Sequence, residues 1–338
     1  MHKFDPSSEK FEKCYTLKMA TKKLKIGVLF GGKSAEHEVS IQSAKFVIDG
    51  LDRAKYIVTP IKIPKDGKFA FDIVKKFDLV FPIFHGPYGE DGTMQGFLKL
   101  AGIPFVGPSV LGSALGLEKD VMKRLLRDAG IPIGKFISCN RSNVPSFAEA
   151  KKKLKVPIFI KPSNGGSSVG VTKVKNQSEF DTAVKSAFVY DDKIILEEMI
   201  KGREIECGVI GNEDPLASVL GEVVPPNGFY TYEAKYADQG GAIYNIPVKL
   251  PKNIERNIRE LAVKTYTTLF CEGMTRVDFF LKENGEVLVN EVNTIPGPVM
   301  FRKLWEATGV TYPDLLDLLV LYSLERFEKE QKLKTSFT

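Results

Sequence analysis

The amino-acid sequence predicts an α/β protein that begins with a parallel, doubly wound sheet, and three observations support this prediction. The run K-I-G-V-L-F at 25–30 is short and apolar, and it leads into glycines and then into a helical pattern that reaches Ile48. Further strand patterns follow at 56–63 and 79–84. Strands that alternate with helices are typical of a parallel sheet, and this alternation continues to about residue 116.

Length and composition allow two or three domains of ordinary size. The chain has 338 residues, of which 43% are hydrophobic and 27% are charged, as in globular proteins. Its formal net charge is +6, but lysine and arginine are spread along the chain and form no nucleic-acid-binding stripe. No apolar run approaches the roughly 18 residues that span a bilayer. We therefore expect neither a nucleic acid nor a membrane as a partner.

The cysteines and the N-terminus indicate where the protein works. Cys14, Cys139, Cys207 and Cys271 are far apart and form no C-x-x-C pair, which favours buried thiols in the cytoplasm over disulfides or a zinc site. Residues 1–21 lack the apolar region of a secretory signal. We expect them to form a mobile extension without a functional role.

The elements after residue 117 follow from their local patterns. A helix is expected from Glu118 to Ala129, where Gly130 ends it. The chain becomes rich in strands from Glu204, and a long Gly/Pro-rich loop at 221–241 has the character of a lid. Further helices are expected at 177–187, 252–270 and 312–330, and further strands at 157–161 and 194–198.

Residues 276–293 predict a hairpin with two facing carboxylates. They read R-V-D-F-F-L-K-E-N-G-E-V-L-V-N-E-V-N, in which two apolar runs flank Asn284-Gly285. Such a pattern predicts a two-residue turn, in which Glu283 pairs with Glu286. In that register Asp278 lies directly opposite Glu291 on one face of the sheet. Like charges directly opposite each other destabilise a sheet, so the arrangement needs a reason.

A divalent cation would supply that reason. Mg²⁺ takes one or two carboxylates and completes its shell with water and phosphate oxygens. Asn293 lies on the same face, opposite Arg276, and the T-I-P-G-P segment that follows adds polar groups at the same end. On spacing alone, splayed strands with solvated acids are an equal alternative, but these extra groups favour the metal site.

Two further segments are candidates for binding a nucleotide. I-K-P-S-N-G-G-S-S-V-G at 160–170 brings Lys161 from a strand into a Gly/Ser loop, whose N–H groups can hold phosphate oxygens. It is not a Walker A loop, and a flexible surface turn is the weaker alternative. In I-L-E-E-M-I-K-G-R-E at 195–204, Glu197, the link at 199–200 and Glu204 could contact adenine and ribose, although a solvated strand end is the default interpretation.

Two glycine-rich segments point to a small ligand. F-G-G-K-S-A-E-H-E-V-S at 30–40 follows a strand and opens a helix, as in anion sites, although Glu36 and Glu38 could simply be acids favoured by the helix dipole. H-G-P-Y-G-E-D-G-T-M-Q-G at 85–96 lets the backbone approach a ligand closely. His85 by itself is more often structural than catalytic.

Together these motifs resemble the D-alanine–D-alanine ligases of the ATP-grasp superfamily. The resemblance rests on G-G-K-S-A-E-H-E-V-S, H-G-P-Y-G-E-D-G-T-M-Q-G, K-P-S-N-G-G-S-S-V-G, F-Y-T-Y-E-A-K-Y and N-E-V-N-T-I-P-G, and it extends from about Lys25 to Phe327. It implies an N-terminal α/β domain followed by a two-lobed ATP-grasp fold. The implied divisions are an extension at 1–21, a substrate domain at 22–117, a central lobe at 118–205 and a C-terminal lobe at 206–338.

The resemblance also implies an activity. Such a ligase joins two D-alanines to D-alanyl-D-alanine through an acyl phosphate, consumes ATP to ADP, and supplies peptidoglycan synthesis. It uses two Mg²⁺ or Mn²⁺ ions per site and is usually a homodimer. Nearby alternatives are a ligase that joins a D-amino acid to a different amine, and a non-catalytic nucleotide-binding protein on the same fold. The latter would have lost metal ligands or lysines that are present here.

Site residues follow from the matched motif positions. Glu36 matches the acid that binds the first substrate's ammonium group, and Arg276 and the Gly297 N–H match the oxyanion site. Catalytic positions are Glu36, Ser167, Tyr236, Arg276 and Gly297. Substrate-binding positions are Val39, His85, Val299 and Met300. ATP-binding positions are Lys119, Lys161, Ser168, Glu197, Ile200, Glu204 and Lys235. Metal ligands are Asp278, Glu291 and Asn293.

Two positions bear on the second substrate. Tyr236 resembles the tyrosine of family members that add an amine, and not the residues of members that add D-lactate. The segment at 297–305, G-P-V-M-F-R-K-L-W, is three residues shorter than the family pattern and has Val299 where the family has a serine that holds the second carboxylate. Valine donates no hydrogen bond. Either Arg302 or another group replaces that serine, or the second substrate differs.

Overall fold

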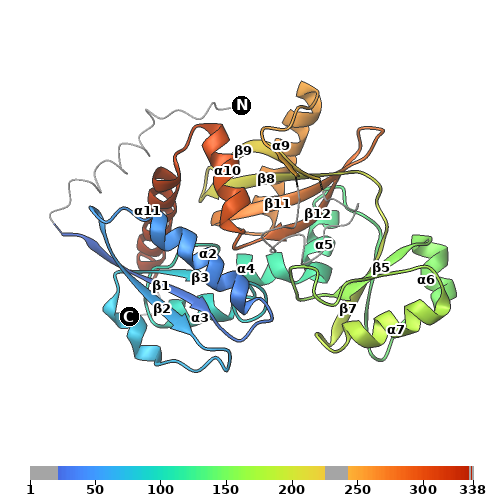
Figure 1. Ribbon diagram of the computed structural model, residues 1–338, viewed down its shortest axis with the longest axis horizontal. Coiled ribbons are helices and arrows are strands. Elements are labelled where there is room, and N and C mark those ends of the chain that lie inside the picture. Colours follow the sequence, from blue (N-terminus) through green and yellow to red (C-terminus); the bar gives the residue numbers. More distant parts are fainter. Residues whose placement is uncertain (1–21, 225–242, 335, 337–338) are drawn as a thin grey trace.

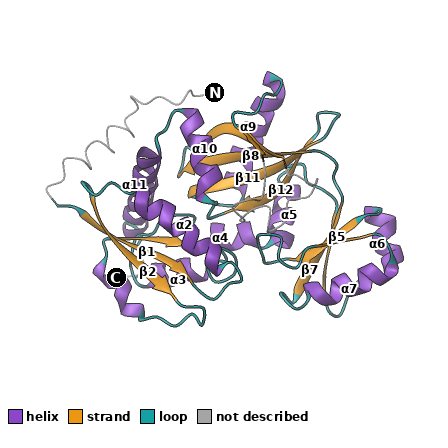
Figure 2. Ribbon diagram, viewed as in Figure 1, coloured by secondary structure: helices purple, strands orange, loops and turns teal. Residues whose placement is uncertain are grey.

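The computed structural model describes residues 22–224, 243–334 and 336, and it contains three sheets (Figure 1). The expected extension at 1–21 lies outside the described residues, as do residues 225–242 of the expected lid. Helices lie between the N-terminal and C-terminal sheets, and other helices cover the outer side of the central sheet (Figure 2). Across the described residues, no helix is long and apolar enough to cross a membrane.

The N-terminal sheet is parallel, as predicted. Its strands, β1 (Leu24–Gly31), β2 (Tyr56–Ile63) and β3 (Leu79–Ile83), pair in the order β2-β1-β3. Alternation along β1 sends Ile26 and Val28 to one core and Leu29 to another, so both faces of the sheet are covered. This is the doubly wound arrangement that the sequence predicts. The helices of this region are α2 (His37–Gly50), η1 (Phe71–Lys76), α3 (Thr93–Leu100) and α4 (Val110–Leu117).

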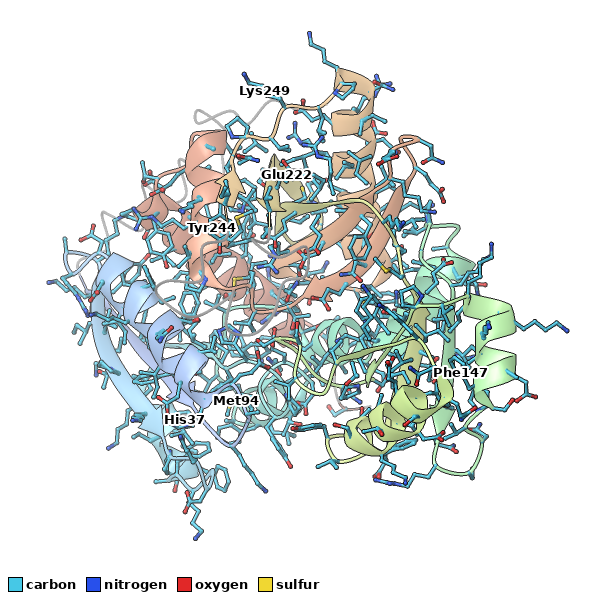
Figure 3. All side chains as sticks on the ribbon, turned by 45° about the vertical axis from the view of Figure 1, so that its right-hand side comes forward. His37, Met94, Phe147, Glu222, Tyr244 and Lys249 are labelled. Atoms are coloured by element: carbon cyan, nitrogen blue, oxygen red, sulfur yellow. The ribbon has the colours of Figure 1, made fainter. Side chains whose placement is uncertain are left out.

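The central sheet is antiparallel and packs against two helices. Its strands are β4 (Phe136–Asn140), β5 (Ile158–Pro162), β6 (Thr172–Val174) and β7 (Lys193–Glu198), in the order β4-β7-β5-β6. Ser146 and Glu149 form a capping box at the start of α6 (Phe147–Leu154), which packs with α7 (Gln177–Ala187) on the core of this sheet. The helix α5 (Lys119–Asp128) precedes it in the chain. In Figure 3, Phe147 lies in this part of the molecule.

The C-terminal sheet is antiparallel and carries the predicted hairpin. Its strands are β8 (Arg203–Gly211), β9 (Leu216–Val224), β10 (Ile243–Asn245), β11 (Gly273–Leu281) and β12 (Val287–Asn293), in the order β10-β9-β8-β11-β12. The expected loop at 221–241 is therefore wrong at its start, because Gly221–Val224 pairs within this sheet. The remaining helices are α9 (Lys252–Thr268), α10 (Pro298–Thr308) and α11 (Tyr312–Gln331).

The hairpin turn differs from the prediction, but the pairing at its far end does not. Lys282 N–H bonds to the Glu286 carbonyl, so the loop has three residues, and Glu283 does not pair with Glu286. Gly285 adopts φ +84°, which favours glycine. A bulge then places Asn290 as an extra residue in β12, and this bulge restores the predicted pairing of Asp278 with Glu291.

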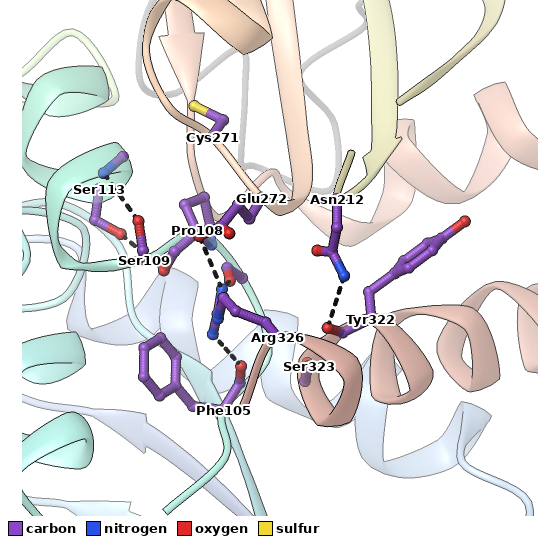
Figure 4. Close-up of polar contacts among 12 residues, drawn as sticks. Phe105, Pro108, Ser109, Ser113, Asn212, Cys271, Glu272, Tyr322, Ser323 and Arg326 are labelled. Atoms are coloured by element: carbon purple, nitrogen blue, oxygen red, sulfur yellow. Dashed lines mark hydrogen bonds and ion pairs between the residues drawn. The ribbon is translucent and has the colours of Figure 1, made fainter. Parts of the chain in front are cut away.

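The last helix ties the C-terminal sheet to the N-terminal part. The Arg326 guanidinium on α11 is buried, donates to the carbonyls of Phe105 (2.7 Å) and Gly107, and lies 4.4 Å from the Phe105 ring centroid (Figure 4). Nearer the start of α11, buried Asp317 pairs with Lys55 and accepts a hydrogen bond from the Tyr56 hydroxyl at 2.6 Å. Because both contacts cross the same boundary, they hold the two sheets in a fixed relation.

Three of the four cysteines lie within the described residues. Cys139, Cys207 and Cys271 are free and buried, as expected. Burial raises the pKa of the Cys139 thiol to about 11 and those of Cys207 and Cys271 to about 12. These thiols therefore stay protonated at neutral pH and behave as small apolar side chains.

Candidate active site

The predicted acidic face forms in the middle of β11 and at the end of β12. Arg276 Nε donates to Asp278 Oδ1 at 2.7 Å and its terminal nitrogen donates to Oδ2 at 2.8 Å. Asn293 Nδ2 donates to the same Oδ2 at 2.9 Å. Glu291 lies across from Asp278 in the register of the two strands. The sequence prediction that these four residues come together is confirmed.

The buried amine of Lys119 reaches the acidic face from α5. Lys119 Nζ lies 4.0 Å from Glu291 and donates to the carbonyl of Gly165 in the Gly/Ser loop. Its pKa is lowered, chiefly because burial disfavours the charged form, although Glu291 acts in the opposite direction. Lys119 therefore connects the hairpin with the loop that is predicted to hold phosphates.

Glu197 on β7 lies between two buried lysines. Lys161 Nζ is 2.5 Å from one of its carboxylate oxygens, and Lys123 Nζ is 2.8 Å from the other. Burial acts to raise the pKa of Glu197, but the two lysines outweigh it and lower the pKa to about 2. Oε1 is buried and pairs with Lys123, but a carboxylate oxygen has two lone pairs, so Oε1 could also accept from a ligand's amino group.

Lys123 was not among the predicted site residues. It lies four residues after Lys119 on α5, so both side chains project from one face of that helix. The i, i+4 spacing was the available signal, but a lysine on a helix is usually a solvated residue. Only the buried contact with Glu197 shows its place in the site.

A cleft of about 280 Å³ joins these groups. It lies between the central and C-terminal sheets, and both polar and apolar side chains line it. The predicted nucleotide-binding residues found in its lining are Lys119, Lys161, Ser168, Glu197, Ile200 and Glu204. Met199, Phe280 and Val289 supply apolar walls that could hold a purine. Lys235 lies outside the described residues.

A second cavity adjoins the first at Gly166, Ser167, Glu206 and Arg276, which line both. The Ser167 hydroxyl donates to buried Glu36, so the Gly/Ser loop of the central part touches the start of α2. The other predicted residues in the lining of this cavity are Val39, His85, Asn293, Gly297, Val299 and Met300. Tyr236 lies outside the described residues.

His85 is a buried group in the lining of the second cavity. Its Nε2 forms a 2.8 Å hydrogen bond with the Ser43 hydroxyl. Burial, with a smaller contribution from the charge on Arg276, lowers its pKa to about 4. At neutral pH the imidazole is therefore uncharged, and it can shape the cavity without repelling a substrate ammonium group.

Glu90 was also missed by the sequence analysis. Its buried carboxylate accepts from Gly86 N–H at 2.7 Å and from Ile295 N–H at 2.9 Å, and thus ties the His85 loop to the segment before Gly297. Burial raises its pKa to about 7, with a contribution from nearby Glu36. Glu90 lies within the H-G-P-Y-G-E-D-G motif, but only His85 and the glycines of that motif were interpreted from the sequence.

Arg302 does not line the second cavity. Its Nε donates to Glu306 at 2.7 Å, and its guanidinium lies 5.1 Å from the Tyr312 ring centroid. Val299 does line the cavity and is 41% exposed. Tyr244 on β10 also borders it, and Figure 3 shows this side chain in the C-terminal part. The described contacts therefore give no support to Arg302 as a replacement for a serine at position 299.

The acidic face fits a hard cation that is shared with a phosphate ligand. Within the described ranges, no group of three or more His, Cys, Asp and Glu side chains is arranged to hold a metal ion by itself. Asp278, Glu291 and Asn293 offer two carboxylates and an amide oxygen, a donor set suited to Mg²⁺. The remaining positions would have to come from phosphate oxygens and water, which the neighbouring cleft could admit.

Comparisons with known proteins agree with this geometry. The family model "D-ala D-ala ligase N-terminus" matches residues 25–77 and 71–108. The family model "D-ala D-ala ligase C-terminus" matches residues 125–321. The chain is 43% identical to a D-alanine–D-alanine ligase of Shouchella clausii, over 93% of this chain and 98% of that protein.

Two solved structures extend the similarity to three dimensions. The D-alanine-D-alanine ligase from Coxiella burnetii is similar with a TM-score of 0.83 and 36% identity, over 92% of this chain and 97% of that one. The enzyme from Bacillus anthracis complexed with ATP gives a TM-score of 0.77 and 31% identity, over 91% and 99% of the two chains.

Proposed function

Since this chain belongs to the D-alanine–D-alanine ligase family and is an ATP-dependent ligase that joins two D-alanines, we propose how its residues carry out that reaction. The observation that carries the proposal is the meeting of two cavities at Arg276, beside the facing carboxylates Asp278 and Glu291. A nucleotide in one cavity and an amino acid in the other would place the reacting groups next to each other.

ATP would occupy the cleft between the central and C-terminal sheets. Glu197 Oε1 would accept from the adenine amino group, and Glu204 would accept from the ribose. Lys119 and Lys161 would stabilise the phosphates, because both amines line this cleft and Lys119 also contacts the Gly/Ser loop. The similarity to a relative solved with ATP supports this assignment.

Asp278, Glu291 and Asn293 would hold the two Mg²⁺ or Mn²⁺ ions that the family uses. When bound, these ions neutralise charge on the transferred phosphate. The fit rests on the donor set and on the nearby phosphate-binding groups, since the protein atoms alone do not complete a coordination shell.

The first D-alanine would bind beside Glu36 in the second cavity. Glu36 is buried in the lining of this cavity, and its negative charge would attract the substrate's ammonium group. The Ser167 hydroxyl holds Glu36 in place and brings the Gly/Ser loop against the substrate. The substrate carboxylate would then face the γ-phosphate and attack it, forming an acyl phosphate and ADP.

The second D-alanine would attack the acyl phosphate through its amine. Arg276 and the Gly297 N–H line the same cavity and would stabilise the negative oxygen of the tetrahedral intermediate. Phosphate then leaves and D-alanyl-D-alanine forms. A ligase that joins a D-amino acid to a different amine is not favoured, because the curated relatives that match nearly the whole chain are D-alanine–D-alanine ligases.

The remaining family properties are part of this proposal. They are the division at 22–117, 118–205 and 206–338, a homodimer, and a cytoplasmic location. Three sheets that each pack against helices support the division. Free, buried cysteines support a reducing compartment.

The proposal is tested by measuring the release of phosphate from ATP in the presence of different amino acids. We expect turnover with D-alanine and Mg²⁺ and D-alanyl-D-alanine as the product by mass spectrometry. L-alanine serves as the matched control and should support no product. Turnover that ignores D-alanine but follows another amino acid would contradict the assigned substrate.

A further inference from the structure

A third carboxylate, Glu206, extends the acidic row at the centre of the site. In the register of the sheet, Glu206 on β8 pairs with Asp278 on β11, and Asp278 in turn pairs with Glu291 on β12. Three acids therefore stand side by side on adjacent strands. Glu206 is buried and lines both cavities, yet no motif in the sequence singled it out.

Arg276 is shared between two of these acids. Both of its donor contacts with Asp278 are at most 2.8 Å, and its Nε also lies 3.2 Å from Glu206 Oε2. The three side chains are between 8% and 14% exposed, so their interactions are weakly screened by water. Burial acts to lower the pKa of Arg276, but Asp278 and Glu206 outweigh it and hold the pKa well above its usual value.

The proposed function makes competing demands on this cluster. Arg276 occupies both oxygens of Asp278, and a cation needs lone pairs on those same oxygens. Bidentate pairing of arginine with a carboxylate is strong, so release of Asp278 carries a cost. If Asp278 were the only counter-ion of Arg276, binding of a cation to Asp278 would leave the buried guanidinium without a compensating negative charge.

We propose that Glu206 is a positioning residue that retains Arg276 when Asp278 turns to a cation, and this inference rests on the proposed function. Glu206 keeps the guanidinium at the junction of the two cavities, where it can face the reacting carbonyl. Asp278 is thereby released for the metal without loss of the charge balance. Asp278 thus serves the metal ion, while Glu206 keeps Arg276 in place to bind the oxyanion.

The geometry distinguishes this role from that of a third metal ligand. Glu206 and Glu291 lie on strands that flank β11, and two strand spacings amount to roughly 9.5 Å. Within the part of the chain that the structure describes, no trio of acids is arranged around a common ion. Glu206 therefore acts through Arg276.

A double-mutant cycle on Mn²⁺ binding tests this inference without turnover. The full-length chain would be titrated with Mn²⁺ by electron paramagnetic resonance, with a non-hydrolysable ATP analogue present. We expect Arg276→Met to bind Mn²⁺ more tightly, because Asp278 loses its competitor. Glu206→Gln should bind about tenfold more weakly, the size of a coupling within one ion-pair network. In the Arg276→Met background, Glu206→Gln should change the affinity less than twofold.

A matched control is available on the same sheet. Glu222 on β9, labelled in Figure 3, pairs with the more exposed Arg203 at 2.6 Å and lies in the lining of neither cavity. Glu222→Gln should leave the Mn²⁺ affinity unchanged. The melting temperature of this variant measures how much stability is lost when an arginine–glutamate pair of this sheet is removed. If Glu206→Gln does not fold, Glu206→Asp keeps the charge with a shorter side chain and gives the same cycle.

The outcomes separate this inference from the proposed function. An equal loss of affinity from Glu206→Gln in both backgrounds would show a direct effect on the ion and overturn the role through Arg276. No loss in either background would overturn it as well. Failure of the wild-type protein to bind Mn²⁺ with the nucleotide would instead overturn the proposed metal site itself.

Discussion

Asp278 lies directly opposite Glu291 even though the turn between their strands is one residue longer than an Asn-Gly turn. Asn290 forms a bulge in β12 and compensates for the longer turn. Bulges often re-aim side chains next to active sites, and this one aligns the two acids. The facing carboxylates therefore depend on two local irregularities of opposite effect.

Removal of the Ser167 hydroxyl should weaken binding of the first D-alanine. Ser167→Ala takes a donor from Glu36, and hydrogen bonds to charged groups contribute about 1.5–3 kcal/mol, so KM for the first D-alanine should rise about tenfold or more. Ser168→Ala, in the same loop and also at positive φ (+61°), should instead affect KM for ATP. Steady-state kinetics in each substrate checks this. Equal effects of both variants on D-alanine would contradict it.

His85 should make the protein less stable in mild acid. Its pKa is about 4 in the folded chain and about 6.5 when unfolded, so the unfolded chain binds more protons between these values. Stability from neutral His85 is therefore complete above pH 6.5 and declines as the pH falls towards 4. By pH 5 the loss should be about 2 kcal/mol, and His85→Gln should lack it.

The measurement is the free energy of unfolding in urea at pH 7.5 and pH 5. Glu90 titrates in the same range with the opposite sign, because its folded pKa is raised to about 7. The informative quantity is therefore the difference between the wild type and His85→Gln at each pH. A difference that does not change with pH would show that His85 has the same pKa in the folded and unfolded protein, and would contradict the prediction.

Substitutions can distinguish the contributions of Val299 and Arg302 to binding of the second D-alanine. Val299→Ser adds a hydroxyl to the lining of the substrate cavity and should lower KM for the second D-alanine several-fold, up to about tenfold. Arg302→Ala should change that KM less than twofold, since Arg302 pairs with Glu306. A tenfold increase from Arg302→Ala would mean that its side chain turns into the cavity and holds the carboxylate.

Loss of the Asp317 carboxylate should destabilise the boundary between the N-terminal sheet and α11. Asp317→Ala leaves the nearly buried amine of Lys55 and the hydroxyl of Tyr56 without this partner, and removal of one member of a buried pair costs about 3–5 kcal/mol. The exposed pair of Lys99 with Glu330 connects the same two regions, so Glu330→Ala should cost less than about 1 kcal/mol. Similar urea midpoints for both variants would contradict the prediction.

The parts of the fold that the sequence predicted are those with strong local patterns. Buried parallel strands such as 79–83 are short apolar runs, and α7 begins at a polar cap and shows a clear helical period. No helix was expected at α10 from the sequence, because T-I-P-G-P at 294–298 has the composition of a loop. Proline is nevertheless favoured in the first turn of a helix, and Pro298 occupies that position.

The predicted site residues came from motifs, and the missed ones are defined by tertiary contacts. Each missed residue is recognisable only from a contact between separate elements. Lys123 on α5 contacts Glu197 on β7, Glu90 joins two loops, and Glu206 on β8 contacts Arg276 on β11. The hairpin illustrates both cases. The pairing of Asp278 with Glu291 was predicted from a two-residue Asn-Gly turn, which does not form. A three-residue turn and a bulge give the same pairing instead, and both depend on backbone details that the residue pattern does not specify.

The most direct test of the central claim is the location of Mn²⁺ by anomalous diffraction in crystals grown with ADP and Mn²⁺. We predict an anomalous peak between Asp278 and Glu291, with Asn293 as a further ligand and the ADP phosphates on the opposite side. A peak elsewhere, or Asp278 still paired at both oxygens with Arg276 while the nucleotide is bound, would contradict the account.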